Sequence, residues 1–126
     1  MRIQLRQAGA LVAAAILIPA VASPAQAAKR PSACAGTSIV TLGPRLAGVP
    51  ESGSSVAYAN GVRQTSYEIV PALRRSRPGD PVRLCLVERP KGCPKGDDRG
   101  SKYAATNLRT RERWTLFDSQ HRCGGA

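Results

Sequence analysis

The chain has 126 residues and a formal net charge of +11, with 19 lysine and arginine residues against 8 aspartate and glutamate residues. A chain of fewer than about 150 residues is expected to form one domain. Length and composition therefore exclude a multidomain enzyme, a coiled-coil rod and a protein with several membrane spans. They do not by themselves identify an activity.

Residues 1–27 have the organisation of a secretory signal peptide. Arg2 and Arg6 precede an apolar run at residues 8–22, and the Ala-Gln-Ala sequence at residues 25–27 supplies the small residues of a signal peptidase site. The run is shorter than the about 20 apolar residues that cross a bilayer. A retained amphipathic anchor is the alternative, but the run has no polar face. We therefore expect export to the periplasm or the extracellular medium, with cleavage after residue 27 and no transmembrane segment in the mature chain.

Removal of the signal peptide changes the length, the net charge and the apolar content of the chain that folds. It leaves 99 residues, and because it removes two arginines and no acidic residue, the charge falls from +11 to +9. Leu, Ile, Val and Phe make up 17 of the 99 residues, below the roughly 20% under which a highly charged chain is usually disordered. Small exported domains with so little core commonly carry disulfides. We expect residues 28–36 to lead into a single domain at residues 37–126.

The four cysteines all lie in the mature part, and their even number predicts two disulfides in an oxidising compartment. Three pairings are possible. We favour Cys85 with Cys93, which lies in a Pro/Gly-rich loop just after the strand that holds Cys85, and Cys34 with Cys123 at the two ends of the domain. A zinc site of three cysteines and His121 is the alternative. The spacings of 8 and 30 residues do not resemble the Cys-x₂₋₄-Cys pairs of zinc sites, so we expect no metal and no cofactor.

The mature sequence predicts an all-β domain. Short runs rich in β-forming residues recur between Gly, Pro, Asn and Asp, and no window has helical periodicity. Strands of this length and spacing favour a small antiparallel barrel or sandwich of about six short strands, held by two disulfides. The expected strands are residues 37–42, 54–59, 62–69, 82–88, 102–108 and 113–117.

The clearest local signal is the Asn60-Gly61 pair between two expected strands. Such a pair is typical of a two-residue type I′ hairpin turn, which would place Val56 opposite Thr65 and turn Val56, Tyr58, Tyr67 and Ile69 to one face. Val82, Leu84 and Leu86 alternate with Arg83, Cys85 and Val87 in the fourth strand. In the last hairpin a turn near residues 109–112 would set Tyr103 and Ala105 beside Trp114 and Leu116. We expect Trp114, Tyr58 and Tyr67 to lie in the core.

Candidate catalytic residues are few. A metal-free nuclease needs a carboxylate base, a histidine acid and an arginine that holds phosphate. Glu68 or Glu112, with His121 and an arginine of residues 109–113, could supply them, but nothing in their spacing singles them out. The acidic pair at residues 97–98 is surrounded by basic residues and predicts a charge-paired turn rather than a calcium site. We favour a non-catalytic binding or structural module, with a small basic exported hydrolase of nuclease type as the alternative.

Basic residues form the remaining signal. They gather at residues 74–77, 89–95 and 109–113, and 15 of the 19 cations are arginine, whose guanidinium binds phosphate and carboxylate bidentately. The alternative is that they reflect genome composition and a solvated surface. A functional basic face would bind an anionic polymer or a membrane surface. The candidate anion-binding residues are Arg74, Arg75, Arg77, Arg109, Arg111 and Arg113.

Overall fold

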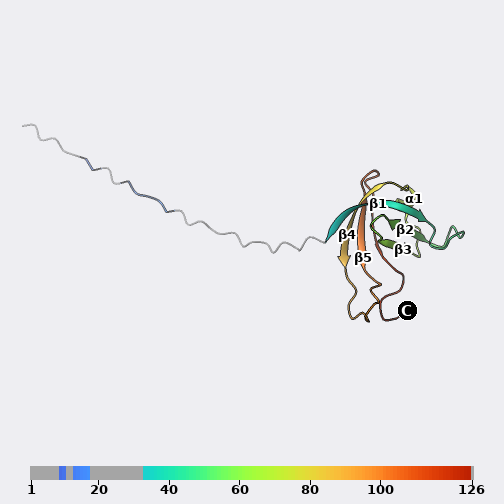
Figure 1. Cartoon of the computed structure of the whole chain (residues 1–126). Coiled ribbons are helices and arrows are strands. Elements are labelled where there is room, and N and C mark those ends of the chain that lie inside the picture. The colour runs from blue at the N-terminus through green and yellow to red at the C-terminus, as the bar shows by residue number, and fades with distance from the viewer. Residues whose placement is uncertain (1–8, 11–12, 18–32, 126) are drawn as a thin grey trace, which may run out of the picture.

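The computed structural model describes residues 9–10, 13–17 and 33–125. Within residues 33–125, six antiparallel strands form a closed barrel in the order β1-β2-β3-β6-β5-β4 (Figure 1). The strands are β1 Cys34–Gly43, β2 Ser54–Tyr58, β3 Arg63–Ser66, β4 Pro81–Glu88, β5 Lys102–Asn107 and β6 Arg113–Phe117. The expected all-β fold is confirmed, and the bounds of the strands differ from the expected ones by at most three residues.

The continuous described part of the chain begins at residue 33. The predicted cleavage site after residue 27 lies outside the described residues, as does most of the predicted signal peptide. The described residues 9–10 and 13–17 are exposed. β1 begins at Cys34, inside the expected lead-in, because Cys34 lies opposite Cys85 in the ladder between β1 and β4. In the part of the chain that the structure describes, no helix is long and apolar enough to cross a bilayer.

The barrel interior is filled by alternate side chains of the strands. Ala105 lies opposite Trp114, and Tyr103 lies opposite Leu116, as the turn near residues 109–112 predicted. One short helix that the sequence did not indicate, α1 (Pro71–Arg74), follows β3 and begins with a proline at its first position, where the missing N–H is harmless. The buried apolar core consists of Ile39, Val56, Tyr58, Ala72, Leu73, Val82, Leu84, Ala105 and Trp114.

The hairpin between β2 and β3 differs from the expected one by a single residue. Val56 lies opposite Gln64 rather than Thr65, and the hydrogen bond from Tyr58 N to Val62 O closes a three-residue loop. Gly61 has a positive φ of 88°, whereas Asn60 does not, and a type I′ turn needs both. Ala59 cannot pair with Val62 because its N–H bonds Ser38 O on β1.

This shift changes which side chains enter the barrel. Gln64 is 1% exposed and lies in the core, whereas Tyr67 is 59% exposed and stacks under the Arg45 guanidinium at 4.4 Å. The prediction that Tyr67 belongs to the core is therefore wrong, and the predictions for Tyr58 and Trp114 are confirmed. A one-residue change of register exchanges the two faces of a strand because side chains alternate with a period of two.

Two disulfides are confirmed, with a pairing other than the favoured one. Cys34 bonds Cys85, and Cys93 bonds Cys123. Cys34 and Cys85 are directly opposed on β1 and β4, with their Cα atoms 3.9 Å apart. Because β1 closes the barrel against β4, Cys85 bonds a cysteine that lies 51 residues earlier in the sequence. The loop cysteine Cys93 then bonds Cys123 in the C-terminal segment.

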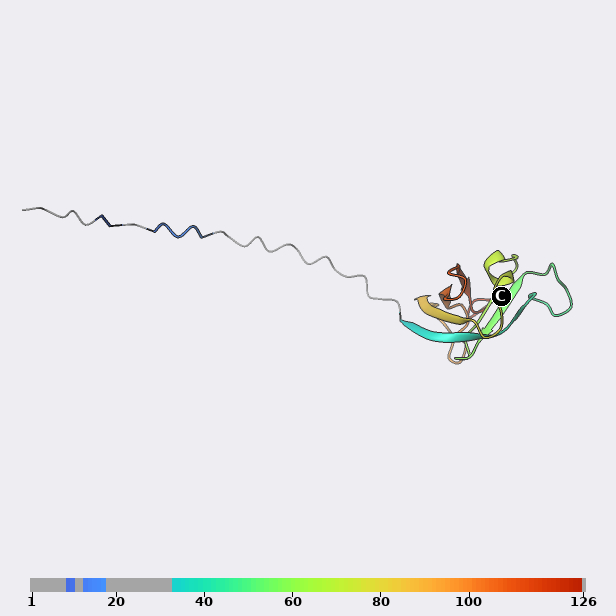
Figure 2. The same cartoon turned by 90° about the horizontal axis from the view of Figure 1, so that it is seen from above.

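The strand connections define two ends of the barrel. The β1–β2 loop at residues 44–53, α1 and the β5–β6 turn at residues 108–112 lie at one end, which we call the helix end. The β4–β5 loop at residues 89–101 and the segment 118–125 lie at the other, which we call the disulfide end because it holds Cys93 and Cys123. Figure 2 shows the β1–β2 loop extending outward from the barrel.

Candidate anion-binding sites

All six arginines predicted to bind anions lie at the helix end. Residues 74–77 cover the end of α1 and the turn after it, and residues 109–113 cover most of the β5–β6 turn and the first residue of β6. The two segments are in contact, because the Arg109 guanidinium donates to Arg75 O at 3.0 Å. The structure therefore joins two basic clusters that are far apart in the sequence into one surface.

Three of these six arginines form ion pairs within the protein, and the pair of Arg109 with Asp80 is the most buried of them. The Asp80 side chain is 6% exposed and accepts hydrogen bonds from Arg109 Nε at 2.6 Å and from Asn107 Nδ2 at 2.8 Å. The hydrogen bonds from Arg109 hold the pKa of Asp80 well below its usual range, against the effect of desolvation. The forked guanidinium of Arg109 is thus directed at a partner inside the protein.

Two more arginines are paired with carboxylates. Arg75 bonds Glu112, which lowers the pKa of Glu112 and raises that of Arg75. Arg74 lies 3.5 Å from Glu51. Within the described residues, Arg77, Arg111 and Arg113 are the members of the predicted set whose side chains are exposed and carry neither an ion pair nor a hydrogen bond. They remain the candidates for anion binding on this surface.

A different group of cations surrounds a cavity at the disulfide end. The cavity has a volume of about 420 Å³. Arg89, Lys91 and Arg122 line it, together with the Phe117 ring and the backbone at Gly100. All three cations are exposed. Neither the β4–β5 loop nor the C-terminal segment forms this cavity alone.

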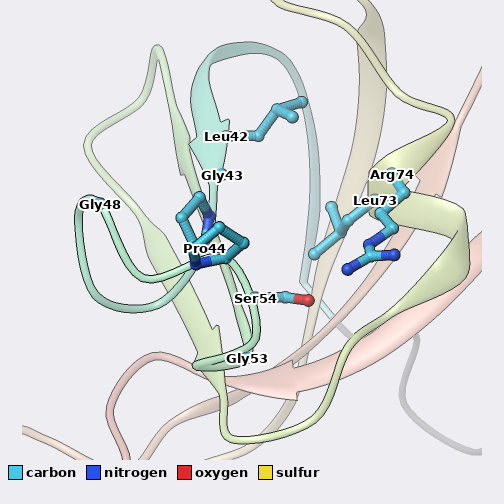
Figure 3. Close-up of a pocket in the computed structure, with 9 residues that line it drawn as sticks. Leu42, Gly43, Pro44, Gly48, Gly53, Ser54, Leu73 and Arg74 are labelled. Carbon is cyan, nitrogen blue, oxygen red and sulfur yellow. The ribbon is translucent and has the colours of Figure 1, made fainter.

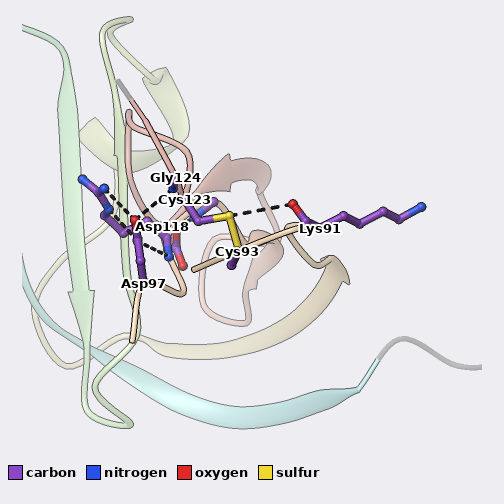
Figure 4. The surroundings of a disulfide bond; sticks show 8 residues. Lys91, Cys93, Asp97, Asp118, Cys123 and Gly124 are labelled. Atoms are coloured by element: carbon purple, nitrogen blue, oxygen red, sulfur yellow. Dashed lines mark hydrogen bonds and ion pairs between the residues drawn. A yellow bond between two sulfur atoms is a disulfide. The ribbon is translucent and has the colours of Figure 1, made fainter. Parts of the chain in front are cut away.

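Three kinds of contact fasten these two segments together around the cavity (Figure 4). The Cys93–Cys123 disulfide crosses between them. Cys123 N donates a backbone hydrogen bond to Arg99 O at 2.9 Å, and Gly100 N donates to the Asp118 carboxylate at 2.8 Å. Gly124 N also donates to Asp97 at 3.0 Å. The position of Arg122 is therefore fixed by its neighbours on both sides.

Asp97 belongs to the same scaffold rather than to a metal site. Its carboxylate accepts two hydrogen bonds of 2.9 Å from the Arg99 guanidinium, and these, followed by the bond from Gly124 N, hold its pKa well below the usual range. The charge-paired turn expected at this position is confirmed. Among the described residues, no group of His, Cys, Asp and Glu has an arrangement that could hold a metal ion, and the cysteines of the zinc alternative are in disulfides.

The electrostatic environment of the disulfide-end cavity is positive. Its one acidic lining residue, Glu88, pairs with Lys102 Nζ at 3.2 Å, and the same Nζ lies 4.7 Å from the centre of the Phe117 ring. The Glu88 charge is thus largely neutralised outside the trio of Arg89, Lys91 and Arg122. Those three side chains have no ion pair or hydrogen bond in the described part of the chain. Unpaired cations gathered at one cavity attract phosphate, sulfate or carboxylate groups.

The sequence indicated only part of this site. Arg89 and Lys91 belong to the basic cluster at residues 89–95, but that cluster was not among the predicted binding residues. Arg122 and Phe117 were missed altogether. The only signal for Arg122 is its position next to Cys123, and it becomes informative once Cys93 is known to be the partner of Cys123.

Glu112 and His121 of the nuclease alternative are not brought together. Glu112 precedes β6 and lies at the helix end, whereas His121 follows β6 and lies at the disulfide end. β6 separates Glu112 from Asp118 by roughly 20 Å, at about 3.3 Å per residue. Glu112 therefore cannot act on the same substrate atom as His121. Glu68 follows β3 and is exposed.

Comparison with known proteins adds no functional assignment. No protein-family model matches the chain, and no curated protein and no solved structure matches it either.

Proposed function

We propose that this protein is an exported, non-catalytic binding module for an anionic polymer, and that one phosphate or sulfate group of the polymer enters the cavity at the disulfide end. The observation that carries the proposal is the gathering of Arg89, Lys91 and Arg122 at one cavity with no internal carboxylate for any of them. Arginines at the helix end show the contrasting arrangement, in which internal carboxylates take up the charge.

The way in which the cavity is built favours binding. Its two segments are cross-linked by Cys93–Cys123 and by short backbone hydrogen bonds. Because the backbone of the site is held before the ligand arrives, binding orders only the side chains and loses less conformational entropy. The arginine guanidinium forms two parallel hydrogen bonds to a phosphate or sulfate, and Lys91 adds a mobile point charge.

Export is supported by the use of the cysteines. Both disulfides join strands or loops of the finished domain, and structural disulfides form and persist in oxidising compartments. The signal-peptide pattern of residues 1–27 provides the route to such a compartment. We therefore propose that the protein acts in the periplasm or outside the cell.

The proposal is tested by binding to heparin and to duplex DNA over a range of salt concentrations. Binding through phosphate or sulfate contacts makes the logarithm of the binding constant fall linearly with the logarithm of the salt concentration, by about 0.9 for each phosphate contact on duplex DNA. The triple variant Arg89→Gln, Lys91→Gln and Arg122→Gln removes the three cations that hold this one phosphate. We expect it to bind weakly at low salt, with a slope on DNA that is shallower by about 0.9.

A matched control separates a site from net charge. The triple variant Arg77→Gln, Arg111→Gln and Arg113→Gln changes the charge by the same amount at the opposite end of the barrel. We expect it to retain most of the binding. Equal losses in the two variants would show that only total charge matters, and a loss confined to the control would place binding at the helix end. Either result, or no retention of the wild type at low salt, refutes the proposed site.

A further inference from the structure

Another cavity lies at the helix end, between the β1–β2 loop and α1. Its volume is about 400 Å³, which falls within the range of small-molecule sites. Figure 3 shows Leu42, Leu73, Ser54 and Arg74 arranged around one space. The lining residues are Leu42, Gly43, Pro44, Gly48, Pro50, Gly53, Ser54, Leu73 and Arg74.

The wall of this cavity is mostly apolar and open. Leucine and proline side chains form its surfaces. A Cβ atom built on Gly43 or Gly48 would meet no other atom within 4 Å. An alkyl chain placed here would be removed from water against Leu42 and Leu73, at about 25 cal/mol per Å² of apolar surface.

Charge enters the cavity at a single point. Among the described residues that line it, Arg74 alone is charged. Its partner Glu51 lies 3.5 Å away and has an 82% exposed side chain, and such an exposed pair contributes little to stability. A ligand carboxylate can replace Glu51 without breaking any buried interaction.

The Ser54 hydroxyl adds a second polar group. Ser54 Oγ accepts a hydrogen bond from Val70 N at 2.8 Å, which leaves its proton for another acceptor. Ser54 is 5% exposed, whereas the Arg74 side chain is 59% exposed. Arg74 is therefore the group that an anionic head group reaches.

We infer that this cavity binds a medium-chain fatty carboxylate, with the alkyl chain between Leu42 and Leu73 and the carboxylate on Arg74. Apart from Arg74 and Ser54, the lining side chains are apolar or, at the glycines, absent, and this favours a ligand with a single polar head group and an apolar chain. The inference does not depend on the proposed polymer binding, which uses the opposite end of the barrel.

The test is a titration of ¹⁵N-labelled protein with octanoate, followed through the amide resonances of Gly43, Gly48 and Gly53. Octanol and octylamine serve as ligands of similar length that are neutral and cationic. We expect saturable shifts at these glycines and binding of octanoate that is about tenfold tighter than that of octanol. Octylamine is expected not to bind, because it places a cation next to Arg74.

Three variants separate the contributions. Arg74→Gln should weaken octanoate about tenfold and leave octanol unchanged, whereas Arg77→Gln, with the same change of charge three residues after α1 ends, should alter neither. Leu42→Asn makes the wall of the cavity polar and should weaken the binding of both. The inference is overturned by the absence of saturable shifts, by equal binding of octanoate and octylamine, or by equal effects of Arg74→Gln and Arg77→Gln. Shifts that depend on protein concentration alone would indicate a second copy in the cavity and would also overturn it.

Discussion

Replacing Gln64 by leucine tests the polar centre of the barrel. The Gln64 side chain is 1% exposed. Its Oε1 accepts hydrogen bonds from the Tyr58 hydroxyl at 2.6 Å and from Trp114 Nε1 at 3.0 Å. Its Nε2 donates to Tyr103 O at 2.8 Å and to Leu116 O at 3.0 Å. Leucine has a similar size and removes all four hydrogen bonds at once.

The magnitude follows from which groups keep a partner. Trp114 Nε1 still donates to the Tyr58 oxygen at 3.1 Å, but the Tyr58 hydroxyl proton loses its acceptor and two carbonyl oxygens each lose a donor. A buried group without a partner costs about 1–3 kcal/mol, and carbonyls with a second lone pair cost less. Allowing for the greater hydrophobicity of leucine, we expect a loss of about 2–3 kcal/mol. In a domain of this size that lowers Tm by about 10–20 °C.

Trp114 is the single tryptophan of the chain, so its fluorescence during urea and thermal unfolding measures the effect directly. Tyr58→Phe is the control within the network, because Gln64 Oε1 then still accepts from Trp114, and its cost should be about 1 kcal/mol. Thr65→Val is the control for the register, because the expected register would have placed Thr65 rather than Gln64 opposite Val56. This change should leave the free energy of unfolding nearly unchanged. The reasoning is wrong if Gln64→Leu is as stable as the wild type, or if Thr65→Val is the more damaging change.

Three further predictions concern the scaffold. Trypsin cuts after Lys91 and so separates Cys85 from Cys93. Digestion of the non-reduced protein should therefore release a peptide that contains Cys34, disulfide-bonded to a peptide that contains Cys85. A disulfide-bonded Cys34–Cys123 product would contradict the fold. Gly53→Ala should lower Tm strongly, because Gly53 has a φ of 118° and a Cβ there would lie 2.0 Å from Ser66 O. Gly43→Ala should leave Tm nearly unchanged, because a Cβ there would meet no atom within 4 Å. Equal changes of Tm in the two variants would contradict the backbone conformation described for Gly53. Pairing with Arg109 lowers the pKa of Asp80 in the folded protein. The contribution of Asp80 to the free energy of unfolding is therefore complete above about pH 4 and declines as the pH falls further. Asp80→Asn should flatten this pH dependence in urea unfolding, and an unchanged pH profile would refute the role of Asp80.

Local sequence signals predicted the strands and one of the hairpins well. The β5–β6 hairpin has the expected pairing because its turn and its alternation agree, and Trp114 points inward as a result. The β2–β3 hairpin carries an equally strong turn signal, yet Ala59 is held by Ser38 on another strand. A distant partner thus overrode the local preference and brought Gln64 inward.

The candidate sites depended still more on distant contacts. Runs of arginine in the sequence do not show which of them have a carboxylate partner, and the partner of Arg109 lies 29 residues away at Asp80. The cavity at the disulfide end is assembled from three separate stretches around Arg89, Phe117 and Arg122. Its residues become neighbours only when the barrel closes and Cys93 bonds Cys123.

The disulfide pairing also has a consequence for the order in which the protein matures. The bonds join the first cysteine to the second and the third to the fourth. In a chain that is exported with its N-terminus first, Cys34 and Cys85 are the first two thiols to arrive, and Cys93 and Cys123 are the next two. Each native bond therefore joins the thiols present at that stage, and vectorial oxidation reaches the final connectivity without rearrangement. Pairing Cys34 with Cys123 would instead require the first thiol to stay reduced until the last one emerged.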